Sequence, residues 1–247
     1  MTINHLHPEL EKGLKALALS GMQNSLPQRN QEAIANQLSY GEFLSLLVQD
    51  ELLAKEHRRF QRRHQNAHFK GNKTLENFDF SFNPKINQAL IRDLITCQFI
   101  REKQPVIIMG PCGTGKSHLA QAIGQAAVQK GFDVLCTTQT QLSDALQVAR
   151  ATNTYARKIK ALAKIALLII DDFGLKPLHT PQDENLHELI SERYEQTSTL
   201  VTSNLALEEW VQAFPNKLLG VAIIDRLRQS ACQLTLDGKS YRAQIKK

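Results

Sequence analysis

The segment Gly110-Pro111-Cys112-Gly113-Thr114-Gly115-Lys116-Ser117 decides the fold. It matches the pattern G-x-x-x-x-G-K-[ST] and lies between an apolar run at 106–109, typical of a strand, and a predicted helix over 117–130. Glycines in this pattern let main-chain N–H groups turn inward around phosphates, where the helix N-terminus adds the positive end of its dipole. The segment therefore predicts a P-loop that binds nucleotide phosphates.

Two side chains of the P-loop have expected roles in chemistry. Lys116 should reach the β- and γ-phosphates, and the Ser117 hydroxyl should ligate Mg²⁺. No N-K-x-D motif that would read guanine occurs in the sequence, so ATP with Mg²⁺ is the expected cofactor pair. The remaining residues expected to hold the nucleotide are Gly110, Pro111, Cys112, Gly113, Thr114 and Gly115.

A second motif is an apolar strand that ends in two carboxylates, Leu167-Leu168-Ile169-Ile170-Asp171-Asp172. This pattern is typical of a Walker B element, in which Asp171 would hold Mg²⁺ directly or through water. Asp172 would polarise the water that attacks the γ-phosphate. Two acids that merely cap a buried strand are the alternative interpretation.

The next apolar strand is followed by Thr202-Ser203-Asn204. A polar side chain at this strand end would project between the two preceding motifs toward the γ-phosphate, and Asn204 is the favoured candidate. An asparagine after a strand is also a common turn former.

The periodicity of apolar residues divides the chain into two parts. Residues 9–70 have apolar positions at helical spacing, and turn formers at 71–74 mark the end of this region. From residue 106 onward, short apolar runs alternate with amphipathic helices, which predicts an α/β fold with a parallel sheet and helices on both faces. We expect a small all-helical domain over 1–72 and an ATPase domain over 73–247. The expected strands are 106–109, 134–137, 166–170, 200–202 and 232–236.

Composition favours a polyanionic partner in a reducing compartment. Thirty Lys and Arg residues against 24 Asp and Glu give a net charge of +6, and the four cysteines lack metal-site spacing. No stretch is long and apolar enough for a membrane span, so a cytoplasmic protein without a membrane partner is expected.

Two basic runs are candidate contacts for the phosphates of double-stranded DNA. The first would form one broad face of a helix, and the second lies between the second and third expected strands. Each run could instead be an ordinary solvated helix face. The candidate residues are Arg58, Arg59, Arg62, Arg63, Arg157, Lys158 and Lys160.

Five ordered motifs together resemble a known branch of ATPases. With GPCGTGKSH, LLIIDDFG, TSN, DRLR and SYR in this order, residues 75–247 are similar to the DnaC and IstB branch of the AAA+ P-loop ATPases. The predicted helix over 14–22, the Tyr40-Gly41-Glu42-Phe43-Leu44 motif and the following basic run resemble the IstB family, whose members help DNA transposition.

The resemblance implies further roles. Arg226 would be an arginine finger inserted into a neighbouring subunit's site, with Arg228 as a second candidate, and Arg242 would be a sensor of the phosphates. Phe78, in the stretch 75–80, would lie near the adenine. Only about ten residues follow the last expected strand, so no C-terminal helical lid is expected.

The resemblance also implies a function and partners. We expect an ATP-dependent DNA-binding helper that forms a homo-oligomer on target DNA and recruits or activates the transposase encoded by the same element. The alternative is a helicase loader of the DnaC type. A nucleoside or nucleotide kinase is disfavoured, because the Asp-Arg element near residue 226 does not fit a small-substrate pocket.

Overall fold

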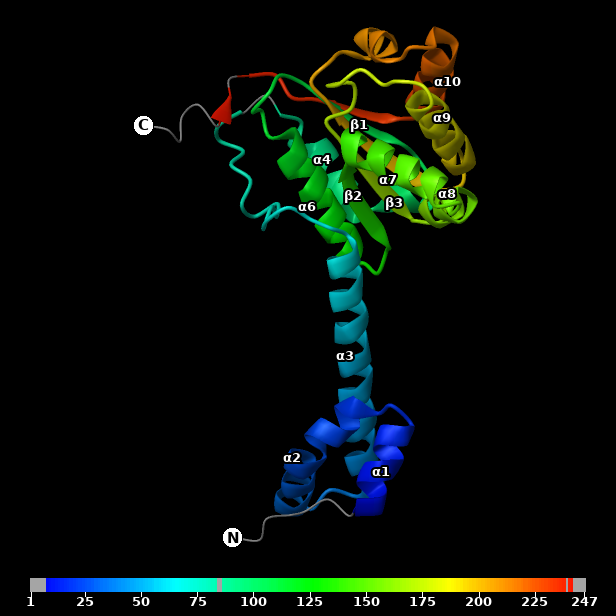
Figure 1. Cartoon of the computed structure of the whole chain (residues 1–247). Helices are drawn as coiled ribbons and strands as arrows, with labels where there is room; N and C mark the ends of the chain where they lie inside the picture. The colour runs from blue at the N-terminus through cyan, green and yellow to red at the C-terminus, as the bar shows by residue number, and fades with distance from the viewer. Residues whose placement is uncertain (1–7, 84–85, 239, 242–247) are drawn as a thin grey trace. The chain divides into compact units, whose positions relative to one another are not determined.

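The computed structural model describes residues 8–83, 86–238, 240 and 241 (Figure 1). The chain divides between Arg62 and Arg63 into two compact units. This division lies before the expected boundary at 72, because the residues after Arg62 pack on the α/β unit. The main-chain N–H of Cys136, for example, donates to the carbonyl of Ala67 (2.8 Å).

The N-terminal unit is helical, as predicted. The prediction of a single helix over 14–22 was wrong, because Ala18 has a φ of +55° and lies between two helices. Its helices are α1 (Pro8–Ala16), α2 (Ser20–Asn36) and α3 (Tyr40–Asn66), the last of which continues into the second unit.

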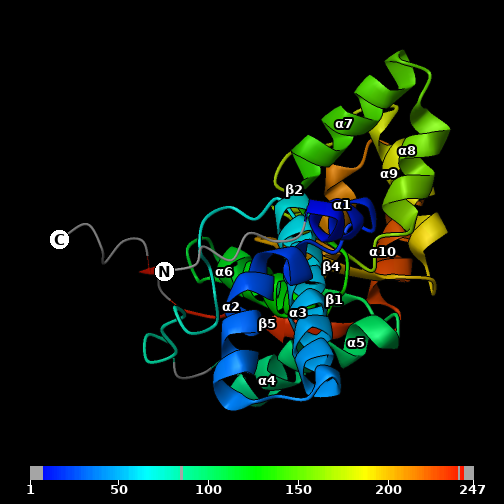
Figure 2. The same cartoon turned by 90° about the horizontal axis from the view of Figure 1, so that it is seen from below.

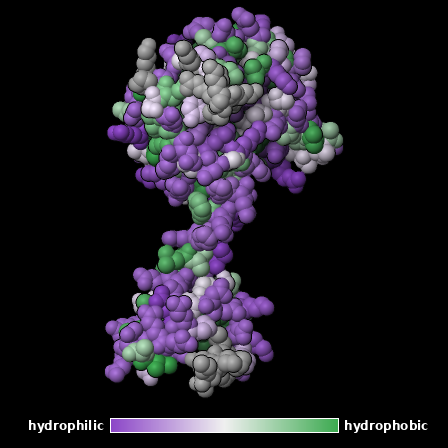
Figure 3. Space-filling view, turned by 90° about the vertical axis from the view of Figure 1, so that its left-hand side faces the viewer, coloured by the Kyte–Doolittle hydropathy of each residue, from purple (hydrophilic) through white to green (hydrophobic). Residues whose placement is uncertain are grey.

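Helices α2 and α3 approach closely where α2 begins. A Cβ atom at Gly21 would lie 2.7 Å from the Cβ atom of Ala54. At the same crossing, buried Glu51 of α3 accepts from the main-chain N–H groups of Gly21 (2.6 Å) and Met22 (3.1 Å). Elsewhere on this unit large apolar side chains such as Tyr40 and Leu53 are exposed, and Figure 3 shows apolar patches on its mostly hydrophilic surface.

The second unit contains a five-stranded sheet in the order β2-β3-β4-β1-β5. All of its strand pairs are parallel, as expected. The strands are β1 (Val106–Met109), β2 (Val134–Thr138), β3 (Leu167–Asp171), β4 (Ser198–Ser203) and β5 (Cys232–Thr235). Strand β4 begins before the expected residue 200, because Ser198 and Thr199 are buried polar residues whose oxygens accept from Arg193.

Helices cover both faces of this sheet (Figure 2). Helices α4 and α6 pack on one face, while α7, α9 and α10 cover the other and α8 packs beside α7 and α9. Apolar side chains of the second face, including Ile107, Ile170 and Phe173, form a buried core. The helices are α4 (Gln88–Thr96), α5 (Gln98–Arg101), α6 (Lys116–Gln129), α7 (Gln139–Ala151), α8 (Tyr155–Ala163), α9 (Gln182–Arg193), the 3-10 helix η1 (Leu207–Ala213) and α10 (Lys217–Arg228).

The strand order determines where a ligand can bind. Because β4 lies between β3 and β1, the segments that follow these three strands meet at one edge of the sheet. After β5 only residues 236–238, 240 and 241 are described, so the absence of a lid stays a prediction. None of the helices in the described ranges combines the length and apolarity that a membrane span requires.

Candidate nucleotide-binding site

The P-loop connects β1 to α6 in a backbone conformation that requires glycine. Gly115 has a φ of +98°, and a Cβ atom there would lie 2.7 Å from the ring of Phe78. Gly113 also has a positive φ, and its carbonyl accepts from the main-chain N–H of Tyr241 (2.9 Å). Side chains at these positions would strain the backbone and collide with the segments that cover the loop.

Lys116 begins α6 and is 6% exposed. Its ammonium group donates to the carbonyls of Gly110 and Pro111, both at 2.7 Å, and the Thr114 hydroxyl also donates to Pro111 (2.9 Å). The charge of Lys116 is therefore held inside the loop, at the N-terminus of α6, where anions are favoured.

Ser117 and Asp171 join the P-loop to the end of β3. The Ser117 hydroxyl donates to Oδ1 of Asp171 (2.8 Å), and the hydroxyl of Thr202 donates to the same oxygen. Among the described residues no cluster of three or more His, Cys, Asp or Glu side chains could hold a metal ion. A hydroxyl and one carboxylate nevertheless fit Mg²⁺, which binds few protein oxygens and takes its other ligands from phosphates and water.

Asp172 and Asn204 line the same cavity as the P-loop residues from Cys112 to Ser117 and Asp171. The φ of Asp172 is +57°, an unusual value for a non-glycine residue, and its main-chain N–H donates to the Thr202 hydroxyl (3.2 Å). Asn204 follows the end of β4, the strand between β3 and β1. The structure thus brings both side chains to the mouth of the P-loop.

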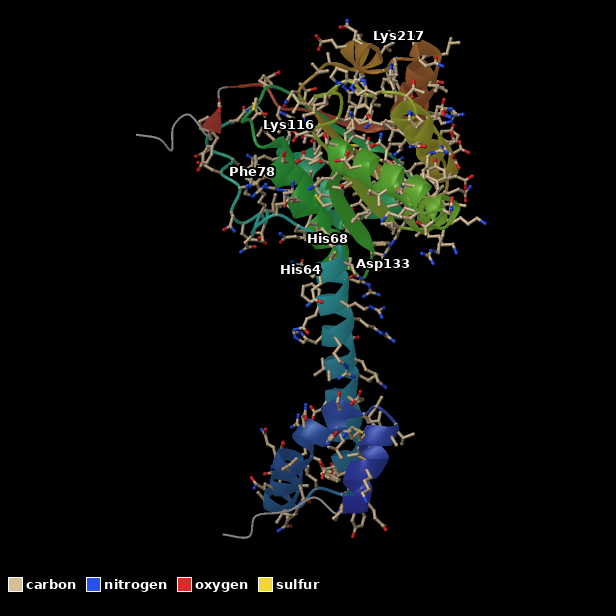
Figure 4. The ribbon with its side chains drawn as sticks, in the orientation of Figure 1. His64, His68, Phe78, Lys116, Asp133 and Lys217 are labelled. Atoms are coloured by element: carbon tan, nitrogen blue, oxygen red, sulfur yellow. The ribbon has the colours of Figure 1, made fainter. Side chains whose placement is uncertain are left out.

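Aromatic residues form another wall of this cavity, whose volume is about 390 Å³. Phe78 meets His118 edge to face, with ring centroids 5.3 Å apart, and Phe82 meets Tyr241 in the same way at 5.0 Å. Figure 4 shows Phe78 beside the start of α6, where Lys116 lies. These rings can cover the flat faces of a nucleotide base.

Arg226 lies at the opposite end of the sheet. It lines a separate cavity together with residues 102–105, which precede β1, and its guanidinium group contacts Nε2 of His187 at 3.4 Å. The P-loop follows the other end of β1, about 13 Å along a strand of this length. Arg226 therefore does not reach the nucleotide cavity of its own chain. Arg228 is exposed near the end of the same helix, and Arg242 lies outside the described residues.

The predicted DNA-binding arginines of α3 differ in their surroundings. Arg58 donates to Glu51 (3.0 Å) within the N-terminal unit, and Arg63 pairs with Asp133 (3.4 Å) in the second unit. Arg59 and Arg62 are exposed. The residues of the second run, Arg157, Lys158 and Lys160, are all exposed on α8.

The fold and the site together define the class of this protein. A parallel sheet in this order, with a P-loop after β1, acidic residues at the end of β3 and a polar residue after β4, is that of an AAA+ P-loop NTPase. Solved structures support this assignment of the fold. AMPPCP-bound DnaA from Aquifex aeolicus is 18% identical with a TM-score of 0.59 over 72% of this chain and 54% of that chain. The DnaC helicase loader is 21% identical with a TM-score of 0.57 over 67% of this chain and 97% of that chain.

Sequence relatives identify the family within this class. The family described as IstB-like ATP binding protein matches residues 12–247, and the chain belongs to it. A protein of Mycobacterium tuberculosis that is named as an ATP-binding protein in an insertion sequence is 36% identical over 95% of this chain and 94% of its own length. The ATP-binding protein of insertion sequence IS21 from Pseudomonas aeruginosa is 33% identical over 97% of this chain and 90% of its own length.

Sequence reasoning assigned no role to several residues at the site, among them Thr202 and His118. Thr202 lies beside Asn204 in the sequence but received no role, although its hydroxyl contacts the carboxylate of Asp171 and the main-chain N–H of Asp172 at the end of β3. His118 directly follows the P-loop motif, and its Nε2 donates to the carbonyl of Thr74 (2.7 Å). The only available signal for His118 was its position next to Ser117.

Proposed function

We propose that this protein is an Mg²⁺-dependent ATPase that helps DNA transposition. It binds double-stranded DNA, assembles on it as a homo-oligomer and recruits or activates the transposase encoded by the same element. The observation that carries this proposal is the separation of Arg226 from the nucleotide cavity of its own chain. An ATPase of this class with its arginine finger at the far end of the sheet completes its site from a neighbouring copy.

Within one subunit, the proposed roles follow the geometry of the cavity. Lys116 offsets the charge of the β- and γ-phosphates, while Ser117 and Asp171 hold Mg²⁺. Mg²⁺ would supply charge neutralisation at the phosphates. Asp172 accepts a proton from the attacking water, and Asn204 orients that water or the γ-phosphate.

The proposed DNA contacts come from exposed basic residues in both units. Arg59 and Arg62 of α3, with Arg157, Lys158 and Lys160 of α8, form no ion pair in the described parts of the chain and so remain available to phosphates. Arg58 and Arg63 are weaker candidates, because each already has a carboxylate partner. Binding of this kind tolerates changes of sequence and weakens steeply with salt.

A test of the proposal measures ATP turnover per subunit against protein concentration, with and without duplex DNA. Turnover per subunit should rise with protein concentration and on addition of duplex DNA, because each interface between subunits completes a site. Lys116→Ala should abolish binding of a fluorescent ATP analogue, and Asp172→Asn should bind the analogue normally but turn ATP over slowly. Turnover per subunit that is independent of concentration and DNA would contradict assembly.

The recruited partner needs its own experiment. The Asp172→Asn variant, assembled on DNA with ATP, should retain the transposase of the same element on immobilised DNA, and Lys116→Ala should not. Retention of a replicative helicase in place of the transposase would support the helicase-loader alternative.

A further inference from the structure

A connector at 67–74 runs along helix α6 toward the P-loop. The ring of Phe69 lies against Gly124, where an added Cβ atom would be 2.8 Å from it, and the main-chain N–H of Lys70 donates to Gln121 (2.9 Å). Next to the P-loop, the carbonyl of Thr74 accepts from His118. The contacted residues of α6, His118, Gln121 and Gly124, are spaced three apart and share one face of the helix. The connector therefore makes a contact at each successive turn. Figure 1 shows this segment beside α6, and Figure 4 labels His68 near its start and Phe78, which follows its end.

The connector places Lys70 and Lys73 in the wall of the nucleotide cavity. Neither ammonium group forms an ion pair or hydrogen bond among the described residues. Burial, followed by the charge of Asp171, raises the pKa of the Cys136 thiol to about 11, while the charges of Lys70 and Lys73 lower it. The connector begins beside β2, because the carbonyl of Ala67 accepts from the main-chain N–H of Cys136 (2.8 Å), and β2 pairs with β3, the strand that ends at Asp171. The connector therefore enters the cavity from the side of β2 and β3.

The charges of the cavity explain why these lysines matter. Among the described residues that line it, three aspartates, Asp79, Asp171 and Asp172, accompany the lysines at 70, 73 and 116. With Lys116 alone, carboxylates would outnumber ammonium groups by three to one. A Mg²⁺–ATP complex carries a net charge of about −2, so a cavity with excess carboxylates would repel it.

We propose that Lys70 and Lys73 bind the terminal phosphate of the nucleotide, so that the connector between α3 and the ATPase core distinguishes ATP from ADP. The inference rests on the proposed nucleotide site and adds two residues outside its motifs. Asp171 and Ser117 would hold Mg²⁺ at the end of β3, so the terminal phosphate that the metal neutralises would lie on the side from which the connector enters. Hydrolysis removes that phosphate, and with it the contact that holds the connector.

The test compares ATP and ADP affinities without DNA by competition against a fluorescent analogue. In the double variant Lys70→Gln/Lys73→Gln, ATP affinity should fall about fivefold, from two partly exposed charge contacts, and ADP affinity should change less than twofold. Lys130→Gln is the matched control, because Lys130 is exposed just after α6 and does not line the cavity. The charge-preserving variant Lys70→Arg/Lys73→Arg should recover ATP affinity.

The outcomes separate the inference from the proposed function. The role of the lysines would be overturned if the double glutamine variant changed the affinities for ATP and ADP equally. It would also be overturned if that variant left both affinities unchanged while Lys116→Ala lost ATP binding, and in either case the P-loop site would stay intact. Normal ATP binding by Lys116→Ala would instead remove the proposed nucleotide site itself. Weaker duplex DNA binding by the double glutamine variant, with an unchanged ratio of ATP to ADP affinity, would assign the lysines to DNA and overturn the inference.

A second measurement follows the connector directly. Trypsin needs a free lysine side chain, so cleavage after Lys70 and Lys73 should be slower with a non-hydrolysable ATP analogue than with ADP, while cleavage after Lys130 should be equal in both. Equal rates at positions 70 and 73 would contradict the proposal.

Discussion

At the scale of single residues, Thr202 connects the two acidic side chains of the site. Its hydroxyl donates to Asp171 and accepts from the main-chain N–H of Asp172, and the residue is completely buried. One hydroxyl therefore restrains both the carboxylate next to Ser117 and the backbone of the proposed base. Asp172 has a left-handed backbone conformation, so this restraint helps to maintain an unfavourable geometry.

Thr202→Val should slow ATP turnover about tenfold, because it leaves the N–H of Asp172 without its buried acceptor while keeping the shape of the side chain. Binding of ATP should stay within about twofold, since Lys116 and the P-loop are unchanged. Thr202→Ser keeps the hydroxyl and should turn ATP over at close to the wild-type rate. Single-turnover hydrolysis measures the effect, and equal rates for the valine and serine variants would remove Thr202 from the site.

At the scale of elements, Arg193 joins the end of α9 to its surroundings. This buried guanidinium group donates to the carbonyls of Leu162 (2.6 Å) and Ile165 (2.9 Å), and to Ser198 and Thr199 at the start of β4. Burial lowers its pKa to about 9, so it remains charged at neutral pH. One side chain thus satisfies carbonyls from the end of α8 to the beginning of β4.

Arg193→Ala should destabilise the α/β unit by about 3 kcal/mol, because it leaves several buried acceptors without donors. For a unit of this size the midpoint of thermal unfolding should fall by about 6–12 °C. Differential scanning calorimetry of the full chain measures the shift. Glu192→Ala, at an exposed position of the same helix, is the control, and a shift no larger than the control's would contradict the role of Arg193.

Glu51 has a comparable role between α2 and α3, and its effect depends on pH. Burial raises the pKa of this carboxyl, but the N–H groups of Met22 and Gly21 and the guanidinium group of Arg58 together lower the pKa below its usual value. A carboxyl with a lowered pKa in the folded state stabilises the fold above its unfolded pKa of about 4.3. This stabilisation is lost as the pH falls through the lower, folded-state value.

Hydrogen exchange of α2 should therefore accelerate as the pH falls from 6 to 3, after correction for intrinsic exchange rates. Glu51→Gln should exchange faster than wild type at pH 6 and show a smaller dependence on pH. Glu56→Gln, at an exposed position of α3, should behave as wild type. Undiminished protection of α2 at pH 3 would show that Glu51 does not stabilise the crossing of the two helices.

At the scale of the whole molecule, the nucleotide cavity and Arg226 occupy opposite ends of one sheet. In the proposed assembly, each chain would present half of a composite site at each end, and head-to-tail contacts would complete the sites between copies. His187 contacts Arg226 in the single chain. Burial, with a smaller effect of the charge of Arg226, lowers the pKa of His187, so the imidazole is neutral at pH 7 and can accept a hydrogen bond from Arg226.

If Arg226 is the proposed finger, Arg226→Ala should bind ATP normally and hydrolyse it at least about 10³-fold more slowly, because an arginine finger acts on the transition state. Mixing Arg226→Ala with Lys116→Ala should restore part of the activity at interfaces that pair an intact finger with an intact P-loop. Arg228→Ala is the comparison, since Arg228 is the other candidate. Normal turnover by Arg226→Ala with slow turnover by Arg228→Ala would move the finger to Arg228. No recovery when the slow arginine variant is mixed with Lys116→Ala would contradict action between subunits.

The sequence alone determined those features that depend on local chemistry. A glycine-rich turn between a strand and a helix can be recognised because its backbone needs residues without Cβ atoms. The parallel sheet, the family and the residues from Gly110 to Ser117 followed from such local signals. The strand starts were less predictable: β4 begins at polar Ser198, whose burial depends on a distant arginine.

Which distant residues share a site depends on contacts that form only in the folded chain. The sequence pattern could not show that the Thr202 hydroxyl contacts both Asp171 and Asp172, because these hydrogen bonds form between the ends of β3 and β4 only in the folded chain. It likewise could not show that the connector follows α6 and brings Lys70 and Lys73 to the cavity, or that Arg58 and Arg63 have carboxylate partners. Periodicity records which face of an element is buried, whereas contacts between elements depend on strand order and helix packing, which are properties of the folded chain.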